Sequence, residues 1–144
     1  MARRRVTIGG TLVLDSDGLC KLAAKDQRAR AYHDSAVARG AQVVVSAITL
    51  AEVLRGSARD AALHRVLSRI ITVPVSASLG RAAGELLGLV GLTGHRCAVD
   101  SVVAATALVM SRPVVVLTSD PEDLSRLVEE PHCPKEHQVA IVRI

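Results

Sequence analysis

Leu12-Val13-Leu14-Asp15 is the stretch of this 144-residue sequence that decides the fold. It is an apolar, β-prone run that ends in a carboxylate, and Ser16-Asp17-Gly18 then turns the chain. In an α/β protein such a run is a buried central strand that ends at the edge of the sheet where ligands bind. We therefore expect Asp15 to lie at a ligand-binding edge.

The composition fits one compact domain with a basic surface. The chain is long enough to bury a core, and 49% of its residues are hydrophobic. Aromatic residues make up 1%, with Tyr32 as the sole example, which removes base stacking as a way to hold nucleic acid. The net charge of +4 comes nearly all from arginine, whose planar fork suits phosphate. A solvated basic surface explains the charge equally well.

Cysteine usage and the apolar segments indicate a cytoplasmic protein without a membrane span. The three cysteines are odd in number and form no CxxC pair, so neither a disulfide framework nor a zinc ribbon is expected. Residues 1–5 are expected to form a loose basic arm, and the apolar run behind them is broken too early for a signal peptide. The apolar stretch 102–117 is interrupted by Ser111-Arg112-Pro113, which favours a helix followed by a strand over a membrane span.

Short apolar runs alternate along the chain with segments of helical periodicity. The expected strands are residues 6–14, 43–45, 71–75, 113–118 and 139–144. The expected helices begin at Asp17 and span 26–38, 49–54, 60–70, 79–90, 99–110 and 121–128, with loops at 91–95 and 130–138. This alternation predicts a single α/β/α domain over residues 1–144, with a mostly parallel sheet of about five strands.

Four acids stand where this fold would gather them. Asp15 and Asp120 each follow an apolar strand, and two neighbouring buried strands would bring them together. Asp100 follows a loop at the start of an expected helix rich in alanine and valine, and Glu52 lies among apolar neighbours. Each acid also has a structural explanation, because Asp15, Asp100 and Asp120 could serve helix starts. Glu52 could complete a capping box that begins at Thr49.

The conjunction of the four acids favours a metal site. Carboxylates that converge at one edge repel one another, so either their pKa values rise or a cation lies among them. Ligands that are all oxygen favour a hard ion such as Mg²⁺ or Mn²⁺. These ions bind phosphate oxygens and lower the pKa of water, which supplies a nucleophile.

Four segments resemble, in order and spacing, the motifs of PIN-domain nucleases and specifically of the VapC-type toxins of bacterial toxin–antitoxin pairs. The match runs through nearly the whole chain, and the segments are Leu14-Asp15-Ser16, 46–56 (SAITLAEVLRG), 100–107 (DSVVAATA) and 117–124 (LTSDPEDL). The sequence departs from the family where Asp17 replaces a small or hydroxyl residue and where Ser101 replaces alanine. The tail at 132–137 is also longer than typical.

The resemblance implies a PIN-like fold and a metal-dependent endoribonuclease. It implies that Mg²⁺ or Mn²⁺ is held by a catalytic set of four acids, which are Asp15, Glu52, Asp100 and Asp120. Hydroxyl support is implied from Ser16 and from Thr118 or Ser119. The resemblance also implies a homodimer, a small antitoxin whose tail blocks the site, and a tRNA or rRNA loop as substrate. Further candidates to contact RNA phosphates are Arg55, Arg59 and Arg96.

Two other functions stay open. A haloacid-dehalogenase-like phosphatase would use Asp15 as nucleophile in the DSDG sequence at 15–18, but it needs a lysine and none lies between Lys25 and Lys135. That function also leaves Glu52 and Asp100 without a role. A non-catalytic PIN-like module would bind RNA or a partner without cutting.

Two details of the sequence bear on the site without a settled role. Asp17 either adds charge to the site or faces solvent. His132, Cys133 and His137 match no standard zinc spacing and are expected to form a surface tail.

Overall fold

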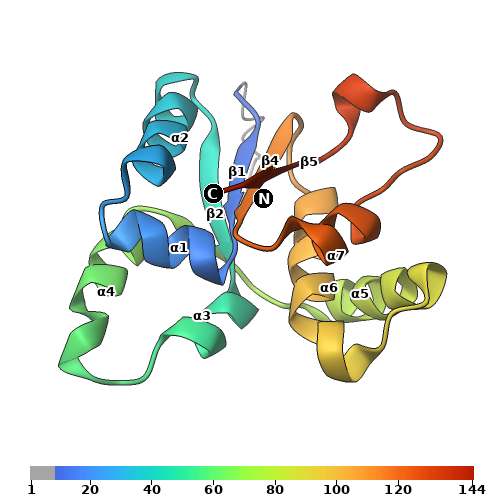
Figure 1. The fold of residues 1–144 in the computed structure, drawn as a ribbon, viewed down its shortest axis with the longest axis horizontal. Coiled ribbons are helices and arrows are strands. Elements are labelled where there is room, and N and C mark those ends of the chain that lie inside the picture. The colour runs from blue at the N-terminus through green and yellow to red at the C-terminus, as the bar shows by residue number, and fades with distance from the viewer. Residues whose placement is uncertain (1–8) are drawn as a thin grey trace, which may run out of the picture.

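A fully parallel five-stranded sheet forms the centre of the molecule in the computed structural model, which describes residues 9–144 (Figure 1). The strand order is β3-β2-β1-β4-β5, and every neighbouring pair runs parallel. The strands are β1 (Thr11–Leu14), β2 (Gln42–Ser46), β3 (Ile71–Val73), β4 (Val114–Thr118) and β5 (Ala140–Arg143). The predicted α/β/α class and the number of strands are confirmed.

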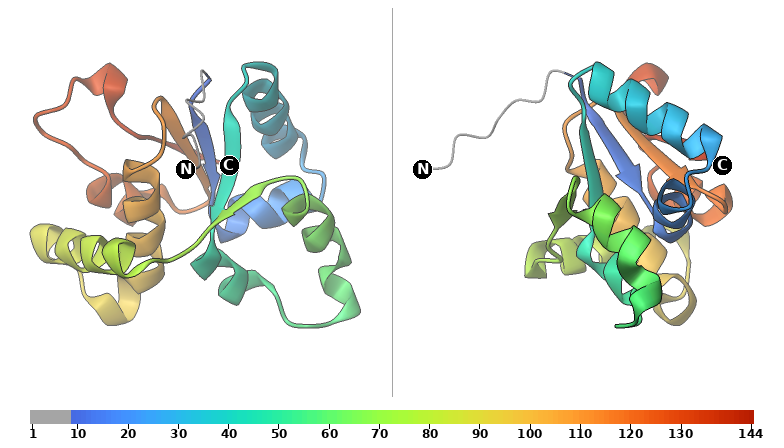
Figure 2. Two further views of the ribbon diagram at one scale, coloured as in Figure 1. Left: turned by 180° about the vertical axis from the view of Figure 1, so that it is seen from behind. Right: turned by 90° about the vertical axis from the view of Figure 1, so that its left-hand side faces the viewer.

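Helices cover both faces of this sheet (Figure 2). They are α1 (Ser16–Ala23), α2 (Gln27–Ala38), α3 (Ala47–Val53), α4 (Ala61–Leu67), α5 (Ala77–Val90), α6 (Gly94–Leu108) and α7 (Pro121–Leu127). Two 3₁₀ turns, η1 (Ala58–Asp60) and η2 (Lys135–His137), lie in the connections. Helices α1, α2 and α4 pack on one face, and α5, α6 and α7 pack on the other.

Alternation of side chains along β1 builds the two layers of the core. Leu12 and Leu14 pack against α1 and α2, whereas Val13 packs against α6 and α7. All three are at most 3% exposed. Successive side chains of a strand point to opposite faces of the sheet. Because helices cover both faces here, every residue of the strand is buried and its sequence is a continuous apolar run.

Several element boundaries differ from the predicted ones. Strand β1 begins at Thr11 rather than at residue 6, and the predicted basic arm at 1–5 lies outside the described residues. Helix α3 begins at Ala47, two residues early, because the Ser46 hydroxyl accepts the Ile48 N–H at 3.3 Å and caps it. Helix α6 begins at Gly94, inside the predicted loop 91–95.

The predicted loop 130–138 is tied down at several points. The Gln138 amide donates to the carbonyls of Glu130 and Cys133 at 3.0 and 2.9 Å, and Arg112 donates to the carbonyl of His137 at 2.9 Å. His132 and His137 are exposed, and residues 9–144 contain no group of three potential ligands that includes them. The final residue, Ile144, donates its N–H to the Thr118 carbonyl at 2.9 Å.

The apolar stretch 102–117 is divided between α6 and β4. Within residues 9–144 no individual helix has the length and hydrophobicity to cross a membrane. Helices α5 and α6 meet that criterion only as a pair, and the chain bends by 118° between them.

Candidate active site

The carboxyl ends of β1 and β4 define the candidate site. These strands are neighbours, Leu14 pairs with Leu117, and the Asp15 N–H donates to the Leu117 carbonyl at 3.3 Å. The chain proceeds from β1 to β2 on one side and from β4 to β5 on the other, so the strand order reverses here. In open parallel sheets, ligands bind in the crevice at such a switch point.

Asp15 directly follows β1 at this switch point, with 8% of the residue exposed. Its Oδ1 accepts the Gly18 N–H at 2.8 Å, so it does cap α1. Burial nevertheless raises the carboxyl pKa, and the negative charge of Asp17 adds to the rise. Hydrogen bonds from the Gly18 amide and the Thr118 hydroxyl oppose the shift without cancelling it.

Gly18 allows α1 to approach the backbone of β4. A Cβ atom at this position would lie 2.8 Å from the Leu117 carbonyl oxygen and 3.3 Å from the Leu117 Cβ. Any side chain would therefore push the start of α1, and with it the Asp15 cap, away from the sheet. The glycine in the turn thus serves close packing at the edge that carries Asp15.

Asp100 lies in the second turn of α6 and not at its start. The explanation as a helix-start residue is therefore wrong, because the helix begins six residues earlier, at Gly94. Burial raises the carboxyl pKa of Asp100 most, followed by the charges of Asp123, Asp15 and Asp120. Within residues 9–144 no hydrogen bond opposes this rise, so among the described residues this half-buried acid has no stabilising donor.

Glu52, on α3, lies near enough to the other acids for their charges to act on it. The capping-box explanation is wrong, since Ser46 caps the helix and Thr49 lies inside it. Loss of water raises the carboxyl pKa of Glu52 first, followed by the charges of Asp100, Asp15 and Asp17. A hydrogen bond with Ser16 opposes the rise. The residue remains largely exposed.

Asp120 lies at the margin of the site. It is exposed, and its side chain makes no capping bond to α7; instead its N–H donates to the Thr118 hydroxyl at 3.1 Å. Its charge is the smallest of those that raise the pKa of Asp100. The charges of Asp15, Glu52 and Asp100 are therefore more strongly linked to one another than to the charge of Asp120.

Two acids outside the predicted set belong to the same field. Asp17 accepts a hydrogen bond from the Ser119 hydroxyl, and its charge acts on Asp15 and Glu52, so it contributes to the site. Asp123 is the strongest charged neighbour of Asp100. Asp123 lies three residues after Asp120, so the two acids are on the same face at the start of α7. This spacing is visible in the sequence and could have indicated Asp123 as a site residue.

The donor chemistry fits a hard divalent ion. Carboxylates from β1, α3 and α6 converge with hydroxyl groups nearby, and oxygen ligands of this kind suit Mg²⁺ or Mn²⁺. Across residues 9–144, however, no three histidine, cysteine, aspartate or glutamate side chains are grouped closely enough to hold an ion as they stand. The acids are close enough to shift one another's pKa values, but they are not positioned to coordinate an ion together.

The predicted phosphate-binding arginines have different surroundings. The Arg55 guanidinium donates to three carbonyls at the end of α3, those of Ala51, Glu52 and Leu54, at 2.8–3.2 Å. Arg59 is exposed in η1. Arg96 is exposed in the first turn of α6, where its charge acts on Cys97.

Comparison with known proteins supports the fold. No family model matches the sequence, and no curated protein matches it either. A chain in the crystal structure of VapBC2 from Rickettsia felis, bound to a DNA fragment from their promoter, matches with a TM-score of 0.64 and 18% identity. The match covers 92% of this chain and 98% of that chain. This chain therefore has a three-layer PIN-like fold.

Proposed function

We propose that this chain is a metal-dependent endoribonuclease and the toxin of a toxin–antitoxin pair. The observation that carries the proposal is electrostatic: the charge of Asp15 raises the carboxyl pKa of both Glu52 and Asp100, and the charge of Asp100 raises that of Glu52. Three elements far apart in sequence thus deliver carboxylates to one crevice at a cost in stability. Such an arrangement is typical of a functional site.

In this proposal Asp15, Glu52 and Asp100 hold Mg²⁺ or Mn²⁺, with Asp120 or Asp123 completing the set. An ion there supplies Lewis acidity toward water and toward a phosphate oxygen. Hydrolysis of the RNA backbone in this way leaves a 5′-phosphate and a 3′-hydroxyl.

Hydroxyl and amide donors position the proposed carboxylates. The Gly18 amide and the Thr118 hydroxyl hold Asp15 from two sides, and Ser16 holds Glu52. Ser119 holds Asp17. Fixed donors of this kind limit the rotation of the carboxylates, which a preorganised site requires.

The phosphatase alternative has less support. In that reaction Asp15 would be a nucleophile and Asp17 an acid, and neither Glu52 nor Asp100 would have a role. The observed coupling of Asp15 with both of these acids is then unexplained.

The proposed partners are an antitoxin and a second copy of the chain. The likeness of fold to a chain of VapBC2 supports an antitoxin partner. Exposed apolar side chains, such as Leu89 (83% exposed) and Val109 (55% exposed), support self-association. Sedimentation of the purified chain would show a dimer if the second proposal is correct.

The test of the proposed function is cleavage of tRNA and rRNA by the purified chain with Mg²⁺ or Mn²⁺, followed by mapping of the new ends. We expect cleavage that chelator stops and that Asp100→Asn reduces by about a hundredfold or more. The matched control is Glu122→Gln, an exposed acid near the same edge whose charge shifts none of the three carboxyls.

In cells, expression of the chain should arrest growth only when its neighbouring gene product is absent. Binding of RNA by a well-folded chain without metal-dependent cleavage would instead identify a non-catalytic module. Cleavage that survives Asp100→Asn would contradict the proposed site.

A further inference from the structure

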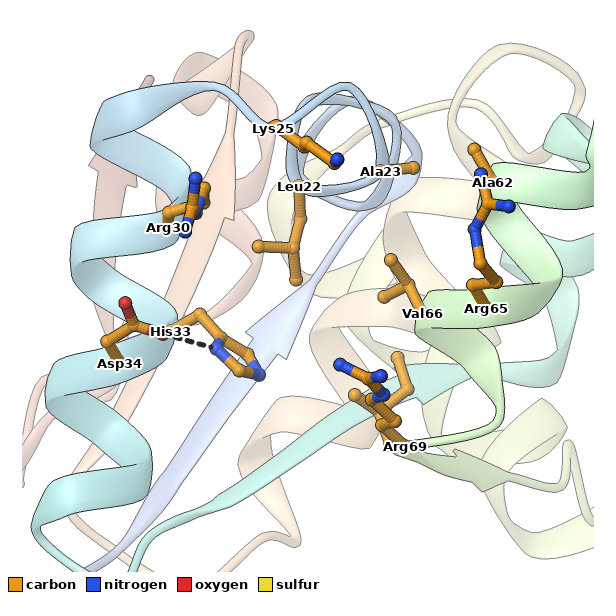
Figure 3. Close-up of a pocket in the computed structure, with 11 residues that line it drawn as sticks. Leu22, Ala23, Lys25, Arg30, His33, Asp34, Ala62, Arg65, Val66 and Arg69 are labelled. Carbon is orange, nitrogen blue, oxygen red and sulfur yellow. Dashed lines mark hydrogen bonds and ion pairs between the residues drawn. The ribbon is translucent and has the colours of Figure 1, made fainter.

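A basic pocket lies between α1, α2 and α4, away from the candidate active site (Figure 3). Its volume of about 440 Å³ is within the range of pockets that hold small molecules or single residues of a polymer. Leu22, Val66 and Ile70 supply apolar lining. Its charged lining comes from five basic side chains and one acid, namely Lys25, Arg30, His33, Arg65, Arg69 and Asp34. None of the carboxylates of the candidate active site lines it.

The positive charges of this pocket are not neutralised within the described chain. Asp34 is the one acid in the lining, and its Oδ1 is 3.1 Å from the Nδ1 of its neighbour His33. The ion pairs within residues 9–144 are His33–Asp34 and Arg112–Glu130, so Lys25 and the three lining arginines have no carboxylate partner. Cations gathered around a concave surface attract an anion.

Basic groups line the pocket from two sides, and His33 and Arg69 point toward one another across it (Figure 3). In Figure 3 the side chains of Arg30 and His33 extend from α2, and those of Arg65 and Arg69 extend from the α4 side. Arg65 lies in the last turn of α4, and Arg69 follows two residues after the helix ends at Leu67. Arginines arranged on two walls can grip phosphate groups with paired hydrogen bonds.

Lys25 gives independent support. Its φ of 61° lies in the left-handed region, where glycine is favoured and lysine is strained. The residue follows the end of α1, a position that glycine commonly fills. A strained residue that also carries charge into a pocket is a sign of function.

The proposed reaction needs such a site. Carboxylates at the crevice repel the phosphates of RNA, so affinity must come from cations elsewhere on the path of the strand. Arg55 contributes little, because its guanidinium is engaged by three carbonyls. Helix α1 connects the two regions, since Asp15 caps its start and Lys25 follows its end. Eight residues at 1.5 Å each span about 12 Å, which a few nucleotides cover.

We propose that the pocket between α1, α2 and α4 binds the phosphate backbone of the RNA substrate beside the segment that is cleaved. This inference rests on the proposed function for the nature of the polyanion. Lys25, Arg30, Arg65 and Arg69 contact the phosphates, and the apolar lining accommodates the adjoining sugar and base. The contacts are independent of sequence and set the affinity of the strand rather than the chemical step.

The test measures binding of a fluorescent 20-nucleotide uridine RNA to the full chain in chelator, so that no cleavage interferes. The variants are Lys25→Gly and the pair Arg65→Gln with Arg69→Gln. The matched control is Arg81→Gln, an exposed arginine on α5. We expect the slope of log affinity against log salt to fall by about 0.7 for each phosphate that the variant no longer neutralises, and the control to keep the original slope.

Lys25→Gly separates binding from folding. Because glycine suits a φ of 61°, this variant should melt no lower than the unsubstituted chain while its RNA affinity falls. Cleavage of a dinucleotide, which is too short to extend from the carboxylates to the pocket, should keep its kcat in these variants.

Unchanged RNA affinity and salt slope in both pocket variants would overturn the inference. Selective binding of a poly-glutamate peptide at the pocket, with RNA binding unaffected by the variants, would overturn it in favour of an acidic polypeptide. If neither the unsubstituted chain nor any variant cleaves RNA, but the pocket variants still bind RNA more weakly, the proposed nuclease activity is wrong and the proposed role of the pocket stands.

Discussion

Asp60 and Asp100 are both shielded aspartates, but their carboxyl pKa values shift in opposite directions. Asp60 is 4% exposed and accepts the N–H groups of Arg55 and Gly56 at 2.9 and 2.8 Å, which lower its pKa. Asp100 accepts no such bond from the part of the chain that the structure describes, and burial and negative neighbours raise its pKa. The first acid therefore stabilises the loop after α3, whereas the second costs stability where it stands.

Replacing these two aspartates by asparagine should separate structure from function. We expect Asp100→Asn to leave the melting temperature unchanged or higher, since it removes charge repulsion, while it abolishes cleavage. Asp60→Asn should lower the melting temperature, because an amide is a weaker acceptor for the two N–H groups. Thermal melts followed by circular dichroism would measure both. A large loss of stability in Asp100→Asn would show that this acid has a structural role.

The same pKa shifts predict a pH dependence with a definite sign. Asp15 and Asp100 have carboxyl pKa values above 3.8, and Glu52 has one above 4.5. At a pH between the ordinary pKa and the raised pKa of such a group, the folded state binds more protons than the unfolded state. The contribution of these groups to stability therefore falls as pH rises through this range. Asp60 acts oppositely, and its contribution is lost as pH falls through its lowered pKa, below 3.8.

The stability gained by Asp100→Asn should therefore be largest near neutral pH and should shrink as the pH approaches 3.8. Cleavage by the unsubstituted chain should fall over the same acidic range, because protonated carboxyls bind metal poorly. Melting temperatures of the two proteins between pH 4 and 8 would test this. A gain that is independent of pH would show that the carboxyl pKa of Asp100 is the same in the folded and unfolded states, so that folding does not shift it.

The identity of the last acid in the set can be decided by a pair of substitutions. Asp123 acts on Asp100 more strongly than Asp120 does. We therefore expect Asp123→Asn to lower the cleavage rate by about tenfold or more, as loss of a supporting carboxylate in a metal site does. Glu122→Gln in the same turn should have little effect. Full activity in Asp123→Asn together with loss in Asp120→Asn would restore the assignment made from sequence.

At the scale of elements, the sequence predicts what is encoded by local pattern and misses what depends on packing. The strands, and hence the edge that carries Asp15, follow from apolar runs. The start of α6 does not, because Gly94 and His95 favour a loop and Thr93 makes no side-chain cap. That turn of α6 packs against α5, as the contact between Gly94 and Leu87 illustrates. Tertiary contact overrides the weak local propensity.

The site shows the same division. The position of Asp15 follows from the strand pattern, since the carboxyl ends of parallel strands share one edge. Glu52 and Asp100 lie on helices α3 and α6, and their approach to Asp15 depends on how these helices pack. The bond between Ser119 and Asp17 joins residues 102 positions apart and has no local signature. The Arg55 guanidinium is likewise oriented by carbonyls at the end of α3, which have no partner within the helix. Its direction could not be predicted without knowing where that helix ends.

The contact between α1 and β4 predicts contrasting effects of two glycine substitutions. Gly18→Ala should destabilise the protein by about 1–3 kcal/mol, because the new Cβ meets the Leu117 carbonyl at 2.8 Å. Gly80→Ala, on α5, meets nothing within 4 Å and should stabilise by about 0.5–1 kcal/mol. Urea unfolding of both variants would measure the difference. Equal effects would show that α1 has room to move.

At the scale of the whole molecule, negative and positive charge are separated along α1. The carboxylates lie at its start and the basic pocket lies near its end. A chain with a net charge of +4 can thus attract a polyanion and still hold a cluster of acids.

Divalent metal should stabilise the whole fold if the acids bind it. At a concentration a hundred times the dissociation constant, Mn²⁺ should add about 2.7 kcal/mol to the free energy of unfolding. Asp100→Asn should lose most of this gain, and Glu85→Gln, an exposed acid on α5, should keep it. Melting with increasing Mn²⁺ would measure the gain. An equal response in all three proteins would show that the ion binds elsewhere.

The hydrogen bond from the Ile144 N–H to the Thr118 carbonyl has a practical consequence. Thr118 also contacts Asp15 and Asp120 through its hydroxyl. A purification handle fused after Ile144 would leave the sheet beside Thr118, and a histidine tag there would place imidazoles near the proposed metal site. Assays of this protein should therefore use material from which such a handle has been removed.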